Sequence, residues 1–197
     1  MDKKDIIFLC LGSIVFYWGA LNFTSKLNFF SSLEFKLILF LLVFATCTLS
    51  ILFSLLIKRK FPWLSQLIKH LVVGGIALIV DLKVFEWLSS LLFLSQARLV
   101  NKGGSFLVAL VLKYVGNKYW AFEKEGKKGI GKEFVLFCIV TFFGILIDIG
   151  VFFYLTEIIT PIFGISLEMW VKLSVIVAAL VAAFWNFLSY KYLIFKK

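Results

Sequence analysis

The feature that most constrains this chain is a succession of long apolar runs. Six runs qualify, at approximately residues 6–25, 37–57, 67–93, 99–121, 133–158 and 168–194. An α-helix needs about 20 such residues to cross the roughly 30 Å hydrocarbon core of a bilayer. The runs are continuously apolar, whereas the strands of a membrane barrel alternate between apolar and polar residues. The sequence therefore predicts an all-α polytopic membrane protein with six transmembrane helices.

The overall composition supports a membrane protein. The 197 residues are 62% hydrophobic, and their mean hydropathy is +1.02. A soluble protein of this size would have to expose a large apolar patch. The formal charge of +10 does not by itself predict a nucleic-acid partner, because membrane proteins collect basic residues in cytoplasmic loops. Since the chain has no nucleic-acid-binding motif, we expect no such partner.

The residues used in soluble-type catalysis are scarce. Cys10, Cys47 and Cys138 each lie inside an apolar run, without the spacing of a metal site. His70 is the single histidine, and no H-E-x-x-H, G-x-S-x-G or phosphate-loop motif is present. We therefore expect no catalytic residues, no metal and no cofactor, and a protein that is not an enzyme.

The distribution of basic residues predicts the orientation in the membrane. One side of the six predicted helices carries Lys3, Lys4, Lys58, Arg59, Lys60, Lys69, Lys124, Lys127, Lys128, Lys132, Lys196 and Lys197. The opposite side carries Lys26, Lys36, Arg98 and Lys102, and its loop at residues 160–166 has no basic residue. Because cytoplasmic loops are enriched in Lys and Arg, both termini are predicted to face the cytoplasm.

Two helices of the chain end with nearly the same sequence. Residues 112–122 are "LKYVGNKYWAF" and residues 185–195 are "WNFLSYKYLIF", each closing with K-Y-x-x-F. Upstream, Asp81 opens "DLKVFEWL" and Asp148 opens "DIGVFFYL". These matches predict two parallel two-helix repeats related by an axis along the membrane normal. In this interpretation the two aspartates are equivalent.

The domain organisation follows from these repeats. Repeat one is predicted at residues 65–122 and repeat two at residues 133–195, together forming a four-helix domain at 65–197. Residues 1–60 add an N-terminal transmembrane hairpin. The basic segment "EKEGKKGIGK" at 123–132 is predicted to link the two repeats on the cytoplasmic side.

Several charged residues lie inside the predicted spans. They are Asp81, Lys83, Glu86, Lys113 and Asp148. A charge at mid-bilayer costs at least about 2.5–3.5 kcal/mol on insertion scales, so each needs a partner or a hydrated cavity. Lys83 and Glu86 are spaced to pair on one helix. Asp81 and Lys113 lie at comparable depths on consecutive helices, so we expect an ion pair between them.

The segment "HLVVGGIALIVDLKVFEWL" at 70–88, then "NKYWAF" at 117–122, a basic loop and a second copy of this pattern resemble the GtrA-like family over about residues 65–197. The family motif N-R/K-x-W-x-F is matched by Asn117, Lys118, Trp120 and Phe122. The second copy keeps Asn186, Lys191 and Phe195 of the fuller N-x-x-x-N-R/K-x-W-x-F pattern. It departs from that pattern at Tyr190 and Leu193, and the first copy departs at Lys113.

The resemblance implies membrane translocation of a polyprenyl-phosphate-linked sugar, or assistance to that step, in cell-surface polysaccharide synthesis. It also implies a bacterial-type cytoplasmic (inner) membrane and a membrane glycosyltransferase as partner. The candidate substrate-binding residues are Lys113, Asn117, Lys118, Trp120, Asn186 and Lys191. An ammonium group and amide donors suit a phosphodiester and sugar hydroxyls. The alternative for these residues is membrane anchoring, with the aromatic side chains in an interfacial belt.

Two other functions remain open. One is a small proton-coupled exporter that uses Asp81, Glu86 and Asp148, since membrane carboxylates often carry protons. The other is a non-transporting scaffold that docks a glycosyltransferase through the basic loop and the N-terminal hairpin. Four helices enclose little space, so a headgroup path is expected to need either a homodimer or the extra hairpin.

Overall fold

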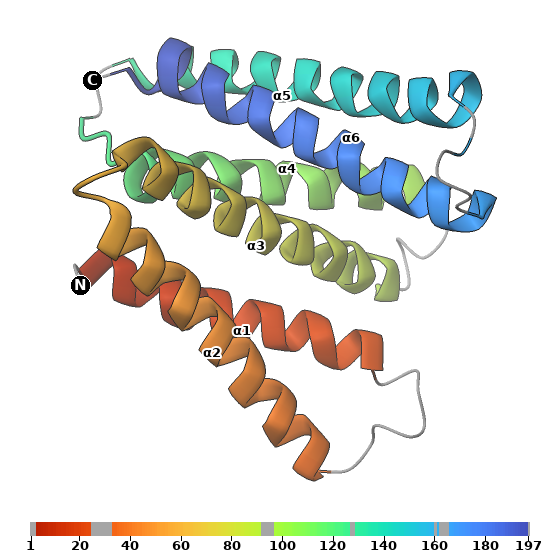
Figure 1. The fold of residues 1–197 in the computed structure, drawn as a ribbon, viewed down its shortest axis with the longest axis horizontal. Coiled ribbons are helices and arrows are strands. Elements are labelled where there is room, and N and C mark those ends of the chain that lie inside the picture. The colour runs from red at the N-terminus through yellow and green to blue at the C-terminus, as the bar shows by residue number, and fades with distance from the viewer. Residues whose placement is uncertain are drawn as a thin grey trace. The chain divides into compact units, whose positions relative to one another are not determined.

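The computed structural model describes residues 3–24, 33–91, 97–126, 129–159, 161 and 166–196. These residues form six long helices (Figure 1), namely α1 (Lys3–Thr24), α2 (Leu33–Ile57), α3 (Pro62–Ser90), α4 (Arg98–Gly116), α5 (Ile130–Phe153) and α6 (Leu167–Ser189). Among the described residues, each of the last three helices continues into a π-turn. These turns are η2 (Asn117–Ala121) after α4, η3 (Tyr154–Ile158) after α5 and η4 (Tyr190–Ile194) after α6. The predicted all-α architecture and its six helices are confirmed.

Four of the described helical segments are long and apolar enough to cross a membrane. They are Phe40–Ile57, Arg98–Ala121, Ile130–Ile158 and Leu167–Ile194. The chain is therefore a multi-pass membrane protein, and the crossing of the membrane by α1 and α3 stays a prediction. Lys26, Lys127, Lys128 and Lys197, which the predicted orientation counts, lie outside the described residues, as do most of residues 160–166 and the side chain of Lys36. The orientation also stays a prediction.

The helix ends have local causes. Pro62 occupies the first turn of α3, where a missing amide hydrogen costs nothing and the fixed φ suits a helix. Ser166 precedes α6, and its hydroxyl accepts a hydrogen bond from the amide of Met169 at 3.4 Å. Such an N-cap satisfies one of the amides that a helix start leaves without an intrahelical partner.

The chain divides into two compact units, Met1–Glu123 and Lys124–Lys197. Unit 1 contains α1 to α4 and η2, so the N-terminal hairpin and the first predicted repeat belong to the same compact body. Unit 2 contains α5, η3, α6 and η4. The division falls within the basic segment that the sequence predicts as the link between the repeats.

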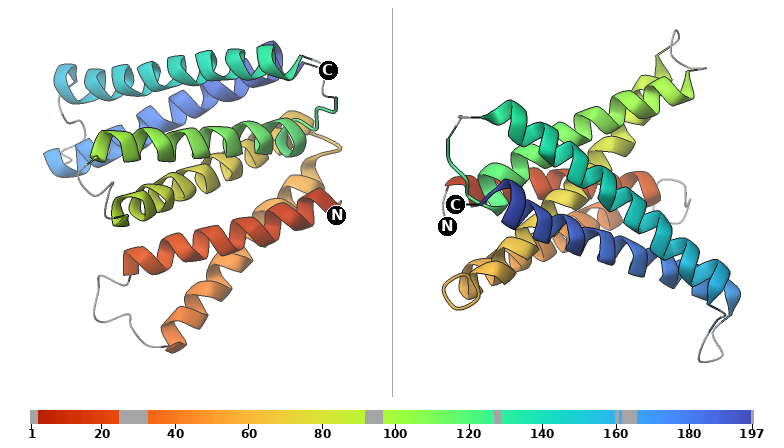
Figure 2. Two further views of the ribbon diagram at one scale, coloured as in Figure 1. Left: turned by 180° about the vertical axis from the view of Figure 1, so that it is seen from behind. Right: turned by 90° about the horizontal axis from the view of Figure 1, so that it is seen from above.

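In unit 1, α3 packs against α1, α2 and α4 (Figures 1 and 2). Leu9, Ile51, Val73 and Trp120 form a buried core cluster that ties α1, α2, α3 and η2 together. Small residues allow close approach, because a Cβ added at Gly75 of α3 would lie 2.7 Å from the Phe16 ring. Glycines at such positions let helices pack closely in a membrane.

In unit 2, α5 and α6 form an antiparallel pair. Every fourth residue of α6 is buried against α5, and these residues are Ser174, Ala178, Ala182 and Asn186. A Cβ added at Gly144 of α5 would lie 2.6 Å from the Asn186 amide oxygen. Small residues therefore set the separation of this helix pair.

The helix that ends each repeat has the same pattern of buried residues. Residues at the same distance before the closing phenylalanine are buried in both helices. Before Phe122 they are Asn101, Ser105 and Ala109 of α4, and before Phe195 they are Ser174, Ala178 and Ala182 of α6. In both copies of K-Y-x-x-F, the residues directly before the phenylalanine form a π-turn. The Phe122 amide bonds the Asn117 carbonyl at 2.9 Å, and the Phe195 amide bonds the Tyr190 carbonyl at 2.7 Å. The repeats thus share local structure, while their parallel arrangement stays a prediction.

Candidate functional site

The motif residues of η2 lie inside unit 1. Asn117, Lys118, Trp120 and Phe122 each have an exposed fraction of 2% or less. Asn117 Oδ1 accepts a hydrogen bond from His70 Nδ1–H at 2.7 Å, and Asn117 Nδ2 donates one to the Lys113 carbonyl at 2.7 Å. A π-turn shifts the register of the backbone hydrogen bonds by one residue. This shift directs the polar side chain of Asn117 toward α3.

Lys118 is buried among aromatic rings of its own helix. Its ammonium group donates to the Tyr114 hydroxyl at 3.3 Å and lies 5.6 Å and 5.5 Å from the ring centroids of Tyr114 and Tyr119. Cation–π contacts of this kind strengthen as the ammonium loses water. Lys118 therefore does not occupy the solvated headgroup position that the anchoring alternative assigns to it.

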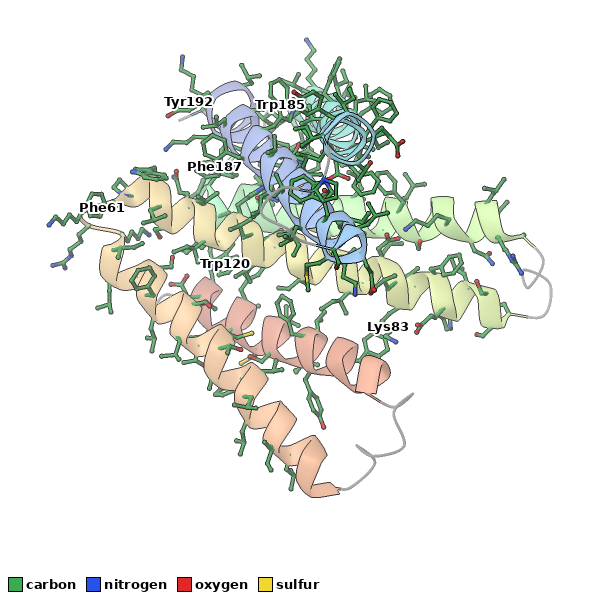
Figure 3. The ribbon with its side chains drawn as sticks, turned by 45° about the vertical axis from the view of Figure 1, so that its right-hand side comes forward. Phe61, Lys83, Trp120, Trp185, Phe187 and Tyr192 are labelled. Carbon is green, nitrogen blue, oxygen red and sulfur yellow. The ribbon has the colours of Figure 1, made fainter. Side chains whose placement is uncertain are left out.

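Trp120 joins the first repeat to the N-terminal hairpin. Its ring stacks on Phe8 of α1 with centroids 4.2 Å apart, and its Nε1 donates to Asp5 Oδ1 at 2.9 Å. Figure 3 places Trp120 between α1 and α3. An interfacial belt residue would face lipid headgroups, so the belt interpretation is wrong for Trp120. A buried indole requires an acceptor, and here the acceptor comes from a residue 115 positions earlier in the chain.

Four charged side chains surround this turn. The Lys69 ammonium lies 3.1 Å from Asp5 Oδ1 and 3.2 Å from Glu123 Oε1, and Lys58 Nζ lies 2.6 Å from the same Glu123 oxygen. Burial raises the pKa of the Glu123 carboxyl, but the hydrogen bonds and positive charges of Lys58 and Lys69 outweigh burial and leave this pKa below its ordinary value. Glu123 has φ 51°, which an L-residue rarely adopts. These ion pairs therefore hold the chain where it leaves η2.

The structure gives Asp81 other partners than the predicted one. Its carboxylate accepts a hydrogen bond from the Ser105 hydroxyl at 2.6 Å and forms an ion pair with Lys102. The expected pair with Lys113 is wrong. The antiparallel packing of α3 and α4 places Asp81 beside Ser105, and Lys113 lies two helical turns further along α4, about 12 Å away.

Lys113 has no acidic partner in the described part of the chain. Its side chain is half-buried in α4, which is one of the candidate spans. Neither an ion pair nor a side-chain hydrogen bond of Lys113 occurs among the described residues. Lys113 therefore does not neutralise Asp81.

The predicted local pair on α3 is confirmed. Lys83 Nζ lies 2.6 Å from Glu86 Oε2, and the ammonium also lies 5.1 Å from the ring centroid of Trp18 on α1. Figure 3 shows Lys83 far along α3 from Phe61, the residue that precedes this helix. Asp81 contacts α4 while Lys83 contacts α1, so the charges of α3 belong to two separate sites.

Unit 2 has its own polar residues between α5 and α6. The hydroxyls of Thr141 and Tyr190 are 2.6 Å apart, and Asn186 is buried with an amide oxygen that has no hydrogen-bond partner. Lys191 lies 5.7 Å from the Phe187 ring centroid and is half-buried. Asp148 is half-buried, and none of the described residues forms an ion pair or hydrogen bond with its carboxylate.

The predicted equivalence of Asp81 and Asp148 does not fit the packing. The first residue of each π-turn forms a hydrogen bond to the preceding helix of its pair. Asn117 of η2 bonds His70 of α3, and Tyr190 of η4 bonds Thr141 of α5. When these bonds are matched, Asp148 corresponds to Ala77 and Asp81 corresponds to Phe152. Asp148 therefore lies one helical turn closer to the π-turn end of its helix pair than Asp81 does.

The residues that could bind a metal ion do not gather. Within the described ranges, no group of three or more His, Cys, Asp or Glu side chains could hold a metal. Cys10, Cys47 and Cys138 are free thiols.

Comparison with known proteins identifies one family. Residues 69–195 match the family described as GtrA/DPMS, transmembrane domain. No curated protein and no solved structure matches the chain significantly. The matched range begins within the first half of α3 and includes both π-turns that carry the repeated phrase, and it excludes the N-terminal hairpin.

Proposed function

The chain belongs to the GtrA/DPMS transmembrane-domain family, and on that premise we propose that it moves a polyprenyl-phosphate-linked sugar across the membrane or assists that step. Family membership makes it a membrane protein of glycoconjugate synthesis, and domains of this family are generally non-catalytic. The proposal assigns it a binding and transport role. A membrane glycosyltransferase would supply the lipid-linked sugar, and either the hairpin or a second copy of the chain would complete the path.

The observation that carries this proposal is the unpaired Lys113. A lysine inside a span costs about 2.5–3.5 kcal/mol on insertion scales, and the described residues offer it no carboxylate. An anionic group that enters from the lipid offsets this cost. A phosphodiester whose polyprenyl chain stays in the bilayer is such an anion, and an ammonium binds phosphate oxygens through charge-assisted hydrogen bonds.

The other candidate residues have different roles in this proposal, according to how accessible their side chains are. Lys191 is half-buried and available to a headgroup, whereas Asn186 is buried against Gly144 of α5 and is assigned a role in packing this helix pair. Asn117, Lys118 and Trp120 are engaged inside unit 1. We assign these three the role of positioning α4, so that Lys113 is held at a fixed depth.

A flipping assay tests the proposal directly. The purified protein is reconstituted in liposomes that contain polyprenyl-phosphate-glucose, and the fraction of headgroups exposed on each leaflet is followed over time. We expect Lys113→Ala to slow flipping by at least about tenfold, which corresponds to about 1.4 kcal/mol, and Lys113→Arg to retain most of the rate. Lys172→Ala is the matched control, because Lys172 is exposed and pairs only one turn away with Glu168.

The outcome separates the rival functions. Absence of flipping by folded protein, with several sugars tried, contradicts the proposal and favours the scaffold. A second candidate, proton coupling, is supported by the half-buried Asp148, whose carboxylate has no partner among the described residues. The same liposomes with and without a pH gradient test it, since a coupled transporter responds to the gradient and loses this response in Asp148→Asn.

A further inference from the structure

A cavity of about 490 Å³ lies between α1 and α3 of unit 1. It is lined by Trp18, Val80, Lys83, Val84, Glu86 and Trp87. Its volume falls within the range of roughly 300–1,000 Å³ that small-molecule sites have, and apolar walls with a few polar groups are typical of such sites. Its lining belongs to neither the Asp5–Lys69–Glu123 cluster nor the surroundings of Lys113.

The polar groups of this cavity cancel in charge. The Lys83 ammonium is almost fully buried, with 7% of its side chain exposed, and pairs with Glu86, of which 60% is exposed. Because the two groups are 2.6 Å apart, the attraction of a charged ligand to one of them is largely offset by its repulsion from the other. A neutral ligand with several hydroxyl groups meets both a donor and an acceptor, and hydrogen bonds to ionised groups are the strong ones.

The apolar groups of the cavity restrict the ligand further. Trp18 and Trp87 have exposed fractions of 49% and 61%, so both contribute exposed aromatic surface to the lining. Indoles offer large apolar faces with a polar edge. The C–H face of a pyranose ring packs on such a surface while its hydroxyls reach neighbouring polar groups. Two tryptophans around a donor–acceptor pair therefore suit a neutral pyranose.

The cavity lies toward the opposite end of unit 1 from η2. From Lys69 to Lys83 along α3 the rise is about 21 Å at 1.5 Å per residue, which is most of the hydrocarbon thickness. Under the predicted orientation the cavity lies near the non-cytoplasmic side. One wall, Trp18, comes from the N-terminal hairpin, which lies outside the family match at 69–195.

We infer that this cavity binds the pyranose ring of a neutral hexoside on the non-cytoplasmic side of the membrane. The inference rests on the proposed function for the lipid carrier, and it gives the hairpin the role of completing the sugar site. The group that the cavity recognises is the hexopyranose ring, which a lipid-linked sugar and a free sugar both carry.

Equilibrium binding in lipid nanodiscs tests the inference with three probes. These are polyprenyl-phosphate-glucose, polyprenyl phosphate without sugar, and free methyl glucoside. We expect the wild type to bind the glycosylated lipid at least about tenfold more tightly than the sugar-free lipid. Loss of a hydrogen bond to an ionised group or of an aromatic wall reduces such a preference by about five- to tenfold, so Glu86→Gln and Trp87→Ala should each reduce this ratio to near one. Trp63→Ala, which removes an exposed tryptophan of α3 outside the cavity, should keep it.

Each outcome decides one question. Equal binding of the two lipids by the wild type shows that the sugar contributes nothing to the affinity and overturns the inference, as does an unchanged ratio in both variants. If methyl glucoside binds saturably and Glu86→Gln weakens this binding, the site is supported and also takes the free sugar. If methyl glucoside does not bind while the preference for the glycosylated lipid is intact, the site takes the lipid-linked sugar. Thermal unfolding confirms that the variants are folded. If the protein does not flip the lipid but still prefers the glycosylated lipid in the binding assay, the proposed function is refuted and the inferred sugar site is not.

Discussion

Removal of the Asp5 carboxylate should destabilise unit 1 strongly. Asp5 and Lys69 have side chains that are 4% and 3% exposed, and Asp5 also accepts the Trp120 indole hydrogen bond. Breaking a buried ion pair by removing one partner costs about 3–5 kcal/mol, because the other charge stays buried. Glu123 remains beside Lys69 and offsets part of this loss. We therefore expect Asp5→Ala to lower the free energy of unfolding by about 3 kcal/mol, and Asp5→Asn, which keeps an acceptor for Trp120, by about 1.5–2 kcal/mol.

Thermal unfolding in detergent, followed by tryptophan emission, measures these effects. For a chain of this length, 1 kcal/mol shifts Tm by about 2–4 °C, so Asp5→Ala should lower Tm by about 6–12 °C. Lys172→Ala removes the exposed pair with Glu168 and should shift Tm by less than about 4 °C, since surface pairs contribute about 0–1 kcal/mol. If Asp5→Ala unfolds within about 2 °C of this control, the pair is solvated and α1 does not pack on the motif of η2.

Two further predictions concern the other ion pairs. Exchange of Asp81 and Lys102 in the double variant Asp81→Lys/Lys102→Asp should restore most of the folded yield that each single reversal loses, whereas exchange of Asp81 with Lys113 should restore none. Rescue by the Lys113 exchange would contradict the register of α3 against α4 that places Asp81 beside Ser105. Glu123→Gln should lower Tm more at pH 7 than at pH 3. A carboxyl whose folded-state pKa is depressed contributes its full stabilisation above its ordinary pKa of 4.5, and this contribution declines as pH falls below that value toward the folded-state pKa. An equal change in Tm at both pH values would refute the role of its charge.

The helices were predictable from sequence because their cause is local. A run of apolar residues that can cross lipid must satisfy its backbone internally, so the run at 37–57 had to become a helix such as Leu33–Ile57. The pair of Lys83 and Glu86 was equally local, since helix geometry alone brings residues three apart together. The repeated phrase marked both K-Y-x-x-F turns, although its spacing alone did not predict the extra residue of a π-turn.

The partners across helices were not predictable in the same way. Asp81 was assigned to Lys113 by counting depth from the helix ends, and the actual partner Lys102 depends on how the two helices slide past each other. Small residues such as Ser105 set that register, because they decide where the backbones can approach. Asp5 gave no signal of its role, since its contact with Trp120 spans 115 positions and arises only from tertiary packing. His70 could have been suspected, because a lone histidine in an apolar run requires a partner, and Asn117 is that partner.

The departures of repeat two from the family motif have a physical explanation in the packing of each turn. Trp120 of repeat one is buried and needs an acceptor, which Asp5 provides. The corresponding residue of repeat two is Leu193, which is 61% exposed and carries no polar hydrogen that requires a partner. At the position of Asn117 repeat two has Tyr190, whose ring stacks on Phe137 with centroids 4.5 Å apart, so an aromatic side chain fills this turn from within its own helix pair. The tryptophan of the motif and the N-terminal hairpin therefore belong together in this chain, and the hairpin acts as the built-in partner of the first repeat.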